Sequence, residues 1–322
     1  MDRETQQPGI AAAYGGEGWS PRTQTLRQEM GSRWGDWGVD LEWAPLQAVL
    51  LHQPGPEIES LVDPNAVQML APLAVERFRQ QHAALAGAYR QAGVAVYYLE
   101  PGGPVPPNSL FCADLFFMTP EGAILARPAS TVRAGEERQV ARRLADLGAP
   151  ILMTVHGDGT FEGADAVWVD EHTALLATGL RTNQSGADQV EWVLHDIGAE
   201  VVRVDLPFGS MHLMGTVRLA GPGIAVGYPG RTPHRAVNLL RERGYRLLWA
   251  PDLDEAKRMA LNFVPLGPNK ILMPADCPNT QALYEAAGIE CVTVEIDELA
   301  KAAGGMGCLS GVLKRGKGET SP

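Results

Sequence analysis

Two residues of this sequence, Cys308 and His212, have side chains suited to covalent catalysis. Cys308 follows Gly304-Gly-Met-Gly, where missing side chains let a substrate come close to the backbone. His212 opens an apolar run, and imidazole exchanges protons near neutral pH. A thiolate that attacks carbon while a histidine moves protons cleaves a bond through a covalent intermediate. Most single cysteines and histidines only pack in a core. The hypothesis therefore requires a fold that brings the side chains of Cys308 and His212 close together. The remaining thiols lack such surroundings and are expected to pack: Cys112, Cys277 and Cys291.

Three carboxylates are candidates for the same site. Asp114 lies between aromatic residues, so its negative charge needs a partner. A planar guanidinium ion is one such partner, because it can donate two hydrogen bonds to the two oxygens of a carboxylate. A structural ion pair with an arginine of the chain is the alternative. Glu162 and Asp165 are three residues apart and would point to opposite faces of a strand, unless Gly163-Ala164 bends the chain. We assign Glu162 to catalysis, and Asp165 to substrate binding with a supporting role for the backbone.

Two arginines could bind a carboxylate of a substrate. Arg181 and Arg127 each follow a predicted strand at a turn. The alternative for either one is a solvated surface side chain.

An internal repeat of about 50 residues decides where these side chains meet. Each of five units has an apolar strand, a helical stretch with apolar residues three and four apart, and a second strand that begins at a glycine. The predicted first strands are residues 48–55, 123–128, 174–179, 224–230 and 270–274. The predicted helices are residues 75–91, 136–147, 187–197, 234–243 and 280–287. The predicted second strands are residues 93–98, 148–153, 198–204, 244–249 and 288–294.

A third strand-like run completes each unit and carries a polar residue near its start. These runs are residues 110–117, 160–169, 211–219, 259–266 and 307–313. Their polar residues are Asp114, Glu162 with Asp165, His212, Asn262 and Cys308. If the units pack around a pseudo-fivefold axis, equivalent positions converge on it. The period alone also permits a doubly wound α/β sheet, but the sequence has no G-x-G-x-x-G after a strand and no P-loop.

Six motifs in order resemble the guanidine-modifying superfamily of arginine deiminases, dimethylarginine dimethylaminohydrolases and amidinotransferases. The resemblance covers about residues 42–316. Among the members of the superfamily, the chain most resembles the dimethylarginine dimethylaminohydrolases. Its motifs are Asn108-Ser-Leu-Phe-Cys-Ala-Asp, Ala126-Arg-Pro-Ala-Ser, Phe161-Glu-Gly-Ala-Asp, Gly179-Leu-Arg-Thr-Asn, His212-Leu and Gly304-Gly-Met-Gly-Cys. The resemblance implies an α/β fold, a five-bladed pseudo-symmetric ββαβ propeller (pentein fold), with no metal and no organic cofactor. It also implies that Asp114 grips the guanidinium, that Arg181 holds a carboxylate, and that Cys308 and His212 are catalytic.

The implied activity is hydrolysis of a small cationic guanidino compound related to arginine. A Cys-amidino (thiouronium) intermediate would give a ureido product such as citrulline and release an amine or ammonia. Many deiminases and amidinotransferases have an aspartate two residues after the histidine, where this chain has Met214. An N-substituted guanidine, with fewer N–H donors, therefore fits better than free arginine.

Two other functions stay open at this point. An amidinotransferase would pass the amidino group to an amine, and Phe161-Glu-Gly-Ala-Asp has some of that character. A non-catalytic propeller that only binds a partner is the second, although it would not need the Cys, His and acid set.

Composition limits the partners and the compartment. The formal net charge is −11, which argues against binding to nucleic acid or to an anionic membrane. The sequence has no run of 18 apolar residues, no secretory signal and no C-x-x-C pair, so we expect a cytoplasmic protein with free thiols. We predict a partly ordered leader (1–41), one catalytic domain (42–316) and a disordered tail (317–322). Whether the chain forms a homodimer stays open.

Overall fold

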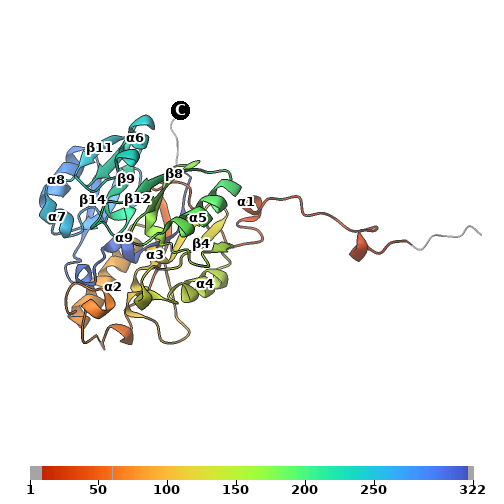
Figure 1. The fold of residues 1–322 in the computed structure, drawn as a ribbon, viewed down its shortest axis with the longest axis horizontal. Helices are drawn as coiled ribbons and strands as arrows, with labels where there is room; N and C mark the ends of the chain where they lie inside the picture. The colour runs from red at the N-terminus through yellow and green to blue at the C-terminus, as the bar shows by residue number, and fades with distance from the viewer. Residues whose placement is uncertain (1–8, 60, 318–322) are drawn as a thin grey trace, which may run out of the picture.

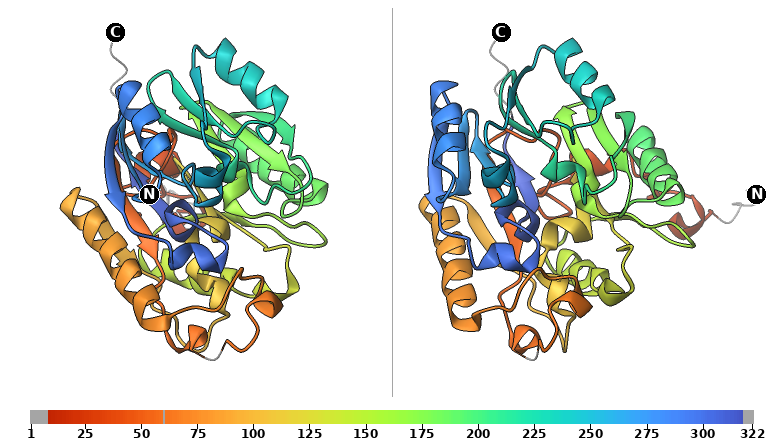
Figure 2. Two further views of the ribbon diagram at one scale, coloured as in Figure 1. Left: turned by 90° about the vertical axis from the view of Figure 1, so that its left-hand side faces the viewer. Right: turned by 60° about the vertical axis from the view of Figure 1, so that its left-hand side comes forward.

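Five small sheets with helices on their outer sides make up the computed structural model, which describes residues 9–59 and 61–317 (Figures 1 and 2). Each sheet has three strands, in the orders β15-β1-β2, β3-β4-β5, β6-β7-β8, β9-β10-β11 and β12-β13-β14. The middle strand pairs antiparallel with the first and parallel with the third. The predicted α/β fold, a pseudo-symmetric ββαβ propeller of five units, is confirmed.

The strands and connecting helices have the following bounds. The strands are β1 (Leu46–Leu51), β2 (Ala95–Tyr98), β3 (Phe116–Thr119), β4 (Gly122–Leu125), β5 (Ile151–Thr154), β6 (Ala166–Asp170), β7 (Thr173–Thr178), β8 (Glu200–Asp205), β9 (Val217–Gly221), β10 (Ile224–Gly227), β11 (Arg246–Trp249), β12 (Val264–Gly267), β13 (Lys270–Pro274), β14 (Glu290–Val294) and β15 (Gly311–Arg315). The connecting helices are α2 (Val75–Gln91), α4 (Glu137–Asp146), α5 (Gln184–Asp196), α6 (His234–Glu242) and α8 (Pro278–Ala286).

Each connecting helix lies between the middle and third strands of its sheet, as the repeat predicts. Its apolar face is buried: in α2, for example, Phe78, Leu85 and Tyr89 are fully buried. The five glycines after these helices all have positive φ, which is why glycine recurs there: Gly93, Gly148, Gly198, Gly244 and Gly288. The first sheet joins the two ends of the domain, because β15 pairs with β1.

The third run of each unit differs from its prediction as a continuous strand. In four units a short helical turn lies at or next to the polar residue, and in the Asn262 unit a non-helical turn precedes it; in every unit the strand starts only after the polar residue. Such a turn satisfies part of its backbone hydrogen bonding locally. The turns are α3 (Cys112–Leu115), η6 (Gly163–Asp165), η7 (Leu213–Gly215) and α9 (Met306–Leu309), and α7 (Leu253–Lys257) precedes the loop to β12.

The N-terminal segment has two parts. Residues 9–25 run away from the body of the molecule, ahead of the short helix α1 (Leu26–Glu29), and Trp19 is exposed (Figure 1). Trp37, by contrast, packs edge-on against Tyr97 and donates its indole N–H to the Leu147 carbonyl at 2.8 Å. The domain therefore starts to pack before residue 42. Residues 1–8 of the predicted leader and 318–322 of the predicted tail lie outside the described residues.

None of the helices in the described ranges has the length and hydropathy needed to cross a membrane.

Candidate active site

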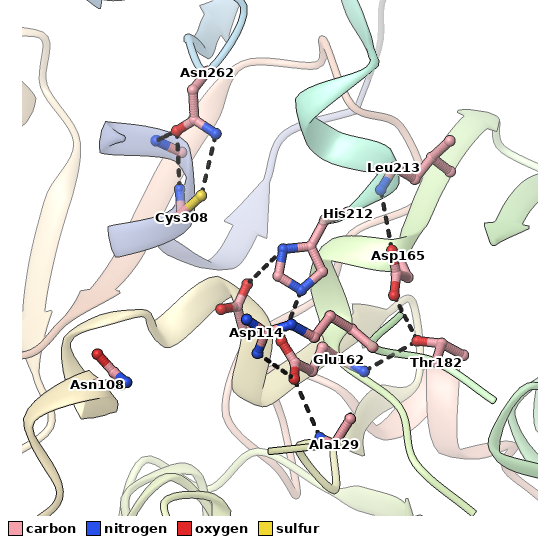
Figure 3. Close-up of polar contacts among 12 residues, drawn as sticks. Asn108, Asp114, Ala129, Glu162, Asp165, Thr182, His212, Leu213, Asn262 and Cys308 are labelled. Atoms are coloured by element: carbon pink, nitrogen blue, oxygen red, sulfur yellow. Dashed lines mark hydrogen bonds and ion pairs between the residues drawn. The ribbon is translucent and has the colours of Figure 1, made fainter. Parts of the chain in front are cut away.

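The polar residues of the five third runs converge, as the pseudo-symmetry predicts (Figure 3). Each one lies a few residues before the first strand of its sheet: before β3, β6, β9, β12 and β15. Three of them, Asp114, His212 and Cys308, line one small cavity of about 20 Å³. The other residues that line it are Gln68, Asn108, Phe111, Arg133, Arg181, Met211, Ala302, Ala303 and Gly304.

His212 and Glu162 form the shortest contact within this group. The Nε2 atom of His212 lies 2.7 Å from Oε2 of Glu162, and its Nδ1 atom lies 3.9 Å from Oδ1 of Asp114. Burial alone would lower the pKa of His212, but the carboxylates of Asp114, Glu162 and Asp165 outweigh it and raise the pKa to about 9. Burial opposes ionisation of Glu162 as well, yet the hydrogen bond and charge of His212 and the two nearby arginines lower its pKa overall. At neutral pH the pair is an imidazolium and a carboxylate.

Arg133 is the main residue that the sequence analysis missed. It is almost fully buried, and its Nη1 atom lies 2.7 Å from Oδ2 of Asp114 and 3.2 Å from Oε2 of Glu162. Glu136 holds the opposite side of the guanidinium, at 2.9 Å from Nη2 and 3.0 Å from Nε. The ion pair with an arginine of the chain, which was the alternative for Asp114, is therefore present. The other oxygen of Asp114, Oδ1, has no hydrogen-bond partner among the described residues.

Asp165 and Arg127 lie outside the cavity, contrary to their assignment to substrate binding. Asp165 accepts hydrogen bonds from Thr182 Oγ1 at 2.6 Å and from the Leu213 N–H at 3.0 Å, so it fixes the backbone beside His212. The turn at Gly163–Asp165 makes this contact available. Arg127 is exposed, and its guanidinium donates to the Gly159 carbonyl. A surface arginine at a turn has no sequence signal that separates it from a ligand-binding one.

Arg181 lies at the rim of the cavity. Its Nη1 atom is 3.3 Å from Oε1 of Glu162, and its Nη2 atom donates to Gln68 Oε1 at 3.4 Å. Gln68 has a left-handed backbone (φ 64°) and also bonds Ser130. Met214 lines a neighbouring cavity of about 50 Å³ with Arg218 and Gly307.

Cys308 lies in α9 and is partly accessible from the cavity. Desolvation, followed by the charge of Asp114, raises the pKa of its thiol to about 11. Cys112 and Cys277 are fully buried and Cys291 is half-buried, in agreement with packing roles. Cys308 is the only one of the four thiols, all of them in described residues, that lines this cavity.

Asp114, Glu162 and His212 also have the donor types of a divalent metal site. In this arrangement, however, the Arg133 guanidinium already contacts one oxygen of each carboxylate. A dication would therefore lie against a buried positive charge, which disfavours metal binding unless Arg133 moves.

We expect stability to fall with rising pH because of Glu136. Burial raises the pKa of this carboxyl to about 8, so the folded state holds its proton more tightly than the unfolded chain. Its contribution is therefore present below the unfolded pKa and is lost as the pH rises toward 8. The Glu136→Gln variant should lose less stability than wild type between pH 5 and 8.5, by on the order of 2 kcal/mol. Urea unfolding at both pH values measures this, and parallel pH profiles for the two proteins would contradict it.

Comparison with known proteins places this site in context. A family model described as "N,N dimethylarginine dimethylhydrolase, eukaryotic" matches residues 67–212. The N(G),N(G)-dimethylarginine dimethylaminohydrolase of Streptomyces coelicolor is 29% identical over 204 residues, which cover 63% of this chain and 74% of that protein. The Pseudomonas aeruginosa enzyme of the same name is 25% identical over 259 residues, which cover 78% of this chain and 94% of that protein.

Solved structures share the fold. A complex of the Pseudomonas aeruginosa enzyme with citrulline has a TM-score of 0.70 and 20% identity, over 83% of this chain and 99% of that chain. An amidinotransferase from Microseira wollei has a TM-score of 0.73 and 15% identity, over 88% of this chain and 99% of that chain.

Proposed function

Because this chain belongs to the guanidine-modifying enzyme superfamily, we propose that it hydrolyses a C–N bond of an N-substituted guanidino compound related to arginine. One observation carries the proposal: a thiol, an imidazole and a carboxylate, those of Cys308, His212 and Asp114, line the same cavity, with Glu162 bonded to the imidazole. The named relatives act on dimethylarginine, which is a substituted guanidine.

Binding begins at Asp114. Its Oδ1 atom has no partner among the described residues, and the other oxygen is held by a guanidinium, that of Arg133. The cavity now has room for about one water molecule, so a substrate guanidinium enters only if Arg133 moves away from Asp114. The substrate guanidinium then binds the Asp114 carboxylate in place of Arg133. Arg181, which also lines the cavity, would bind a carboxylate on the substrate tail.

The bound cation also activates the nucleophile. With the pKa of Cys308 near 11 and that of His212 near 9, the free enzyme at neutral pH holds a thiol and an imidazolium. A guanidinium next to the sulfur favours the thiolate, so the thiol proton passes to solvent as the substrate binds. The thiolate then attacks the central guanidinium carbon. The tetrahedral adduct collapses as His212 donates its proton to the leaving amine. The neutral imidazole then takes a proton from water, whose oxygen attacks the thiouronium carbon, and the C–S bond breaks to give a ureido product.

The small number of carboxylates that line the cavity favours a guanidine that carries a substituent on nitrogen. Asp114 is the one carboxylate among the residues that line the cavity in the described part of the chain. Met214 replaces the aspartate found in many deiminases, and it lies in the neighbouring cavity. Fewer acceptors suit a guanidinium with fewer N–H donors.

Product analysis tests this proposal. The protein is incubated with arginine, methylated arginines and guanidino acids, with and without glycine, and products are identified by mass spectrometry. The expected result is a ureido product with a released amine, independent of glycine and absent in Cys308→Ala. Product that forms only with glycine would indicate an amidinotransferase instead. No product from any of these compounds would contradict the proposed substrate class.

A further inference from the structure

Asn262 is the residue of the fourth polar position, and its side chain contacts the nucleophile rather than the cavity. It lies in the loop before β12, and its Nδ2 atom is 3.1 Å from Sγ of Cys308 (Figure 3). Its Oδ1 atom accepts from the Gly307 N–H at 2.7 Å and from the Cys308 N–H at 3.2 Å. Because both backbone groups are donors, they require the carbonyl oxygen to face them, and the amide nitrogen must then face the sulfur.

The glycines before Cys308 make room for this contact. A Cβ atom at Gly305 would lie 2.6 Å from Asn262 Oδ1, and one at Gly307 would lie 2.9 Å from the same atom. Both distances are too short for real side chains. The Gly-rich stretch therefore lets Asn262 reach the nucleophile, in addition to leaving space for a substrate.

A second link holds Asn262 itself. Arg218 donates to the carbonyl of the next residue, Phe263, at 2.8 Å, and its guanidinium lies over the Phe263 ring. The backbone of Asn262 is tied further, since its N–H bonds to the Met259 carbonyl at 2.8 Å and its carbonyl accepts from Gly307 at 3.2 Å. The amide is thus fixed before any substrate arrives.

We propose that Asn262 is a positioning residue for Cys308: its carbonyl oxygen fixes the backbone of the nucleophile turn, and its amide N–H hydrogen-bonds the sulfur and stabilises the thiolate. This inference rests on the proposed function only for the identity of the nucleophile. A hydrogen bond to the charged form of an acid lowers its pKa, so the amide acts in the direction that nucleophilic attack needs. Asn262 is not among the residues that line the cavity, so its loss should change kcat rather than KM.

Other charged and titratable side chains line the cavities on which Cys308 and Gly307 border. Asp114, Arg133, Arg181 and His212 line the cavity that Cys308 lines. Arg218 lines the neighbouring cavity together with Gly307. The substitutions at Asn262 leave all five of these charged or titratable residues in the chain.

The test compares alkylation of Cys308 by iodoacetamide in wild type, Asn262→Asp and Asn262→Ala. Aspartate keeps the acceptor for the Gly307 and Cys308 N–H groups, but it loses the donor and adds a negative charge beside the sulfur. Below the thiol pKa the alkylation rate follows the thiolate fraction, so a higher pKa slows the reaction at every pH. Rates are measured between pH 7.5 and 10 by mass spectrometry of the peptide that contains Cys308, and circular dichroism identifies the folded variants.

We expect Asn262→Asp to react at least about tenfold more slowly than wild type across this range, which corresponds to a pKa rise of about one unit or more. Asn262→Ala should also be slower. Asn238→Asp, an exposed substitution on α6, is the matched control for added charge and should match wild type. Wild-type alkylation of Cys308 in either folded Asn262 variant would overturn the inference. Alkylation does not require turnover, so a protein that hydrolyses no guanidine yet shows the slower reaction would contradict only the proposed function.

Discussion

The Cys308→Ser variant should lose at least about a thousandfold in kcat while it still binds substrate. A serine hydroxyl is not ionised near neutral pH, even beside a cation, so the attack on the guanidinium carbon fails. Binding should change little, because Asp114, the proposed partner of the guanidinium, belongs to another unit of the fold and still lines the cavity. Steady-state kinetics on the substrate found by product analysis measures the first effect, and calorimetry with the same compound measures the second.

The covalent step can be tested separately from the loss of rate. Acid quenching of wild type during turnover should trap a mass increase on the peptide that contains Cys308, and the serine variant should show none. Cys291→Ser is a matched control, since this half-buried thiol on β14 does not line the cavity, and its sulfur lies 3.7 Å from the Ile289 carbonyl. It should keep full activity. A wild-type rate in Cys308→Ser would exclude the cysteine mechanism.

The five units and their polar residues could be predicted because the repeat is visible in the sequence. The repeat period, the glycines at helix ends and the spacing of apolar residues can all be read locally. If the units are related by pseudo-symmetry, these signals also predict that equivalent residues lie close together around the axis. The helix α2 is an example, since its predicted bounds match those observed at Val75–Gln91. The prediction for the third runs was less accurate, because short helical turns near the axis have no periodicity of their own.

Arg133 shows what local signals do not contain. In the sequence it is one more arginine in a polar loop, before an acidic stretch. Its burial depends on three carboxyl groups. Glu136 is a near neighbour in the chain, whereas Asp114 and Glu162 belong to two other segments. Such a cluster forms only when the fold brings these segments together, and a single sequence carries no record of that pairing. Asn262 is similar: the repeat marked its position, but its contact with the sulfur depends on the glycines of another unit.

A large loss is also expected for His212→Asn, in the range of about a hundredfold to ten-thousandfold in kcat. Asparagine can still bond Glu162, but it cannot protonate the leaving amine or take a proton from water. His195→Asn on α5 is a suitable control, because this exposed histidine does not line the cavity and lies 4.0 Å from Glu191. Activity of His212→Asn within about threefold of wild type would contradict the assignment.

The pH dependence of kcat/KM connects this histidine to Glu162. Because the surrounding carboxylates raise the pKa of His212 in the free protein to about 9, it stays protonated through neutral pH, and kcat/KM should fall as the pH rises through about 9. Glu162→Gln removes the charge at 2.7 Å from Nε2, so the alkaline limb should move to lower pH. The same shift appears in stability: the contribution of His212 is complete below its unfolded pKa near 6.5 and is lost as the pH rises through 9. In Glu162→Gln that loss should begin at lower pH, and an alkaline limb that stays in place would show that Glu162 does not set the pKa of His212.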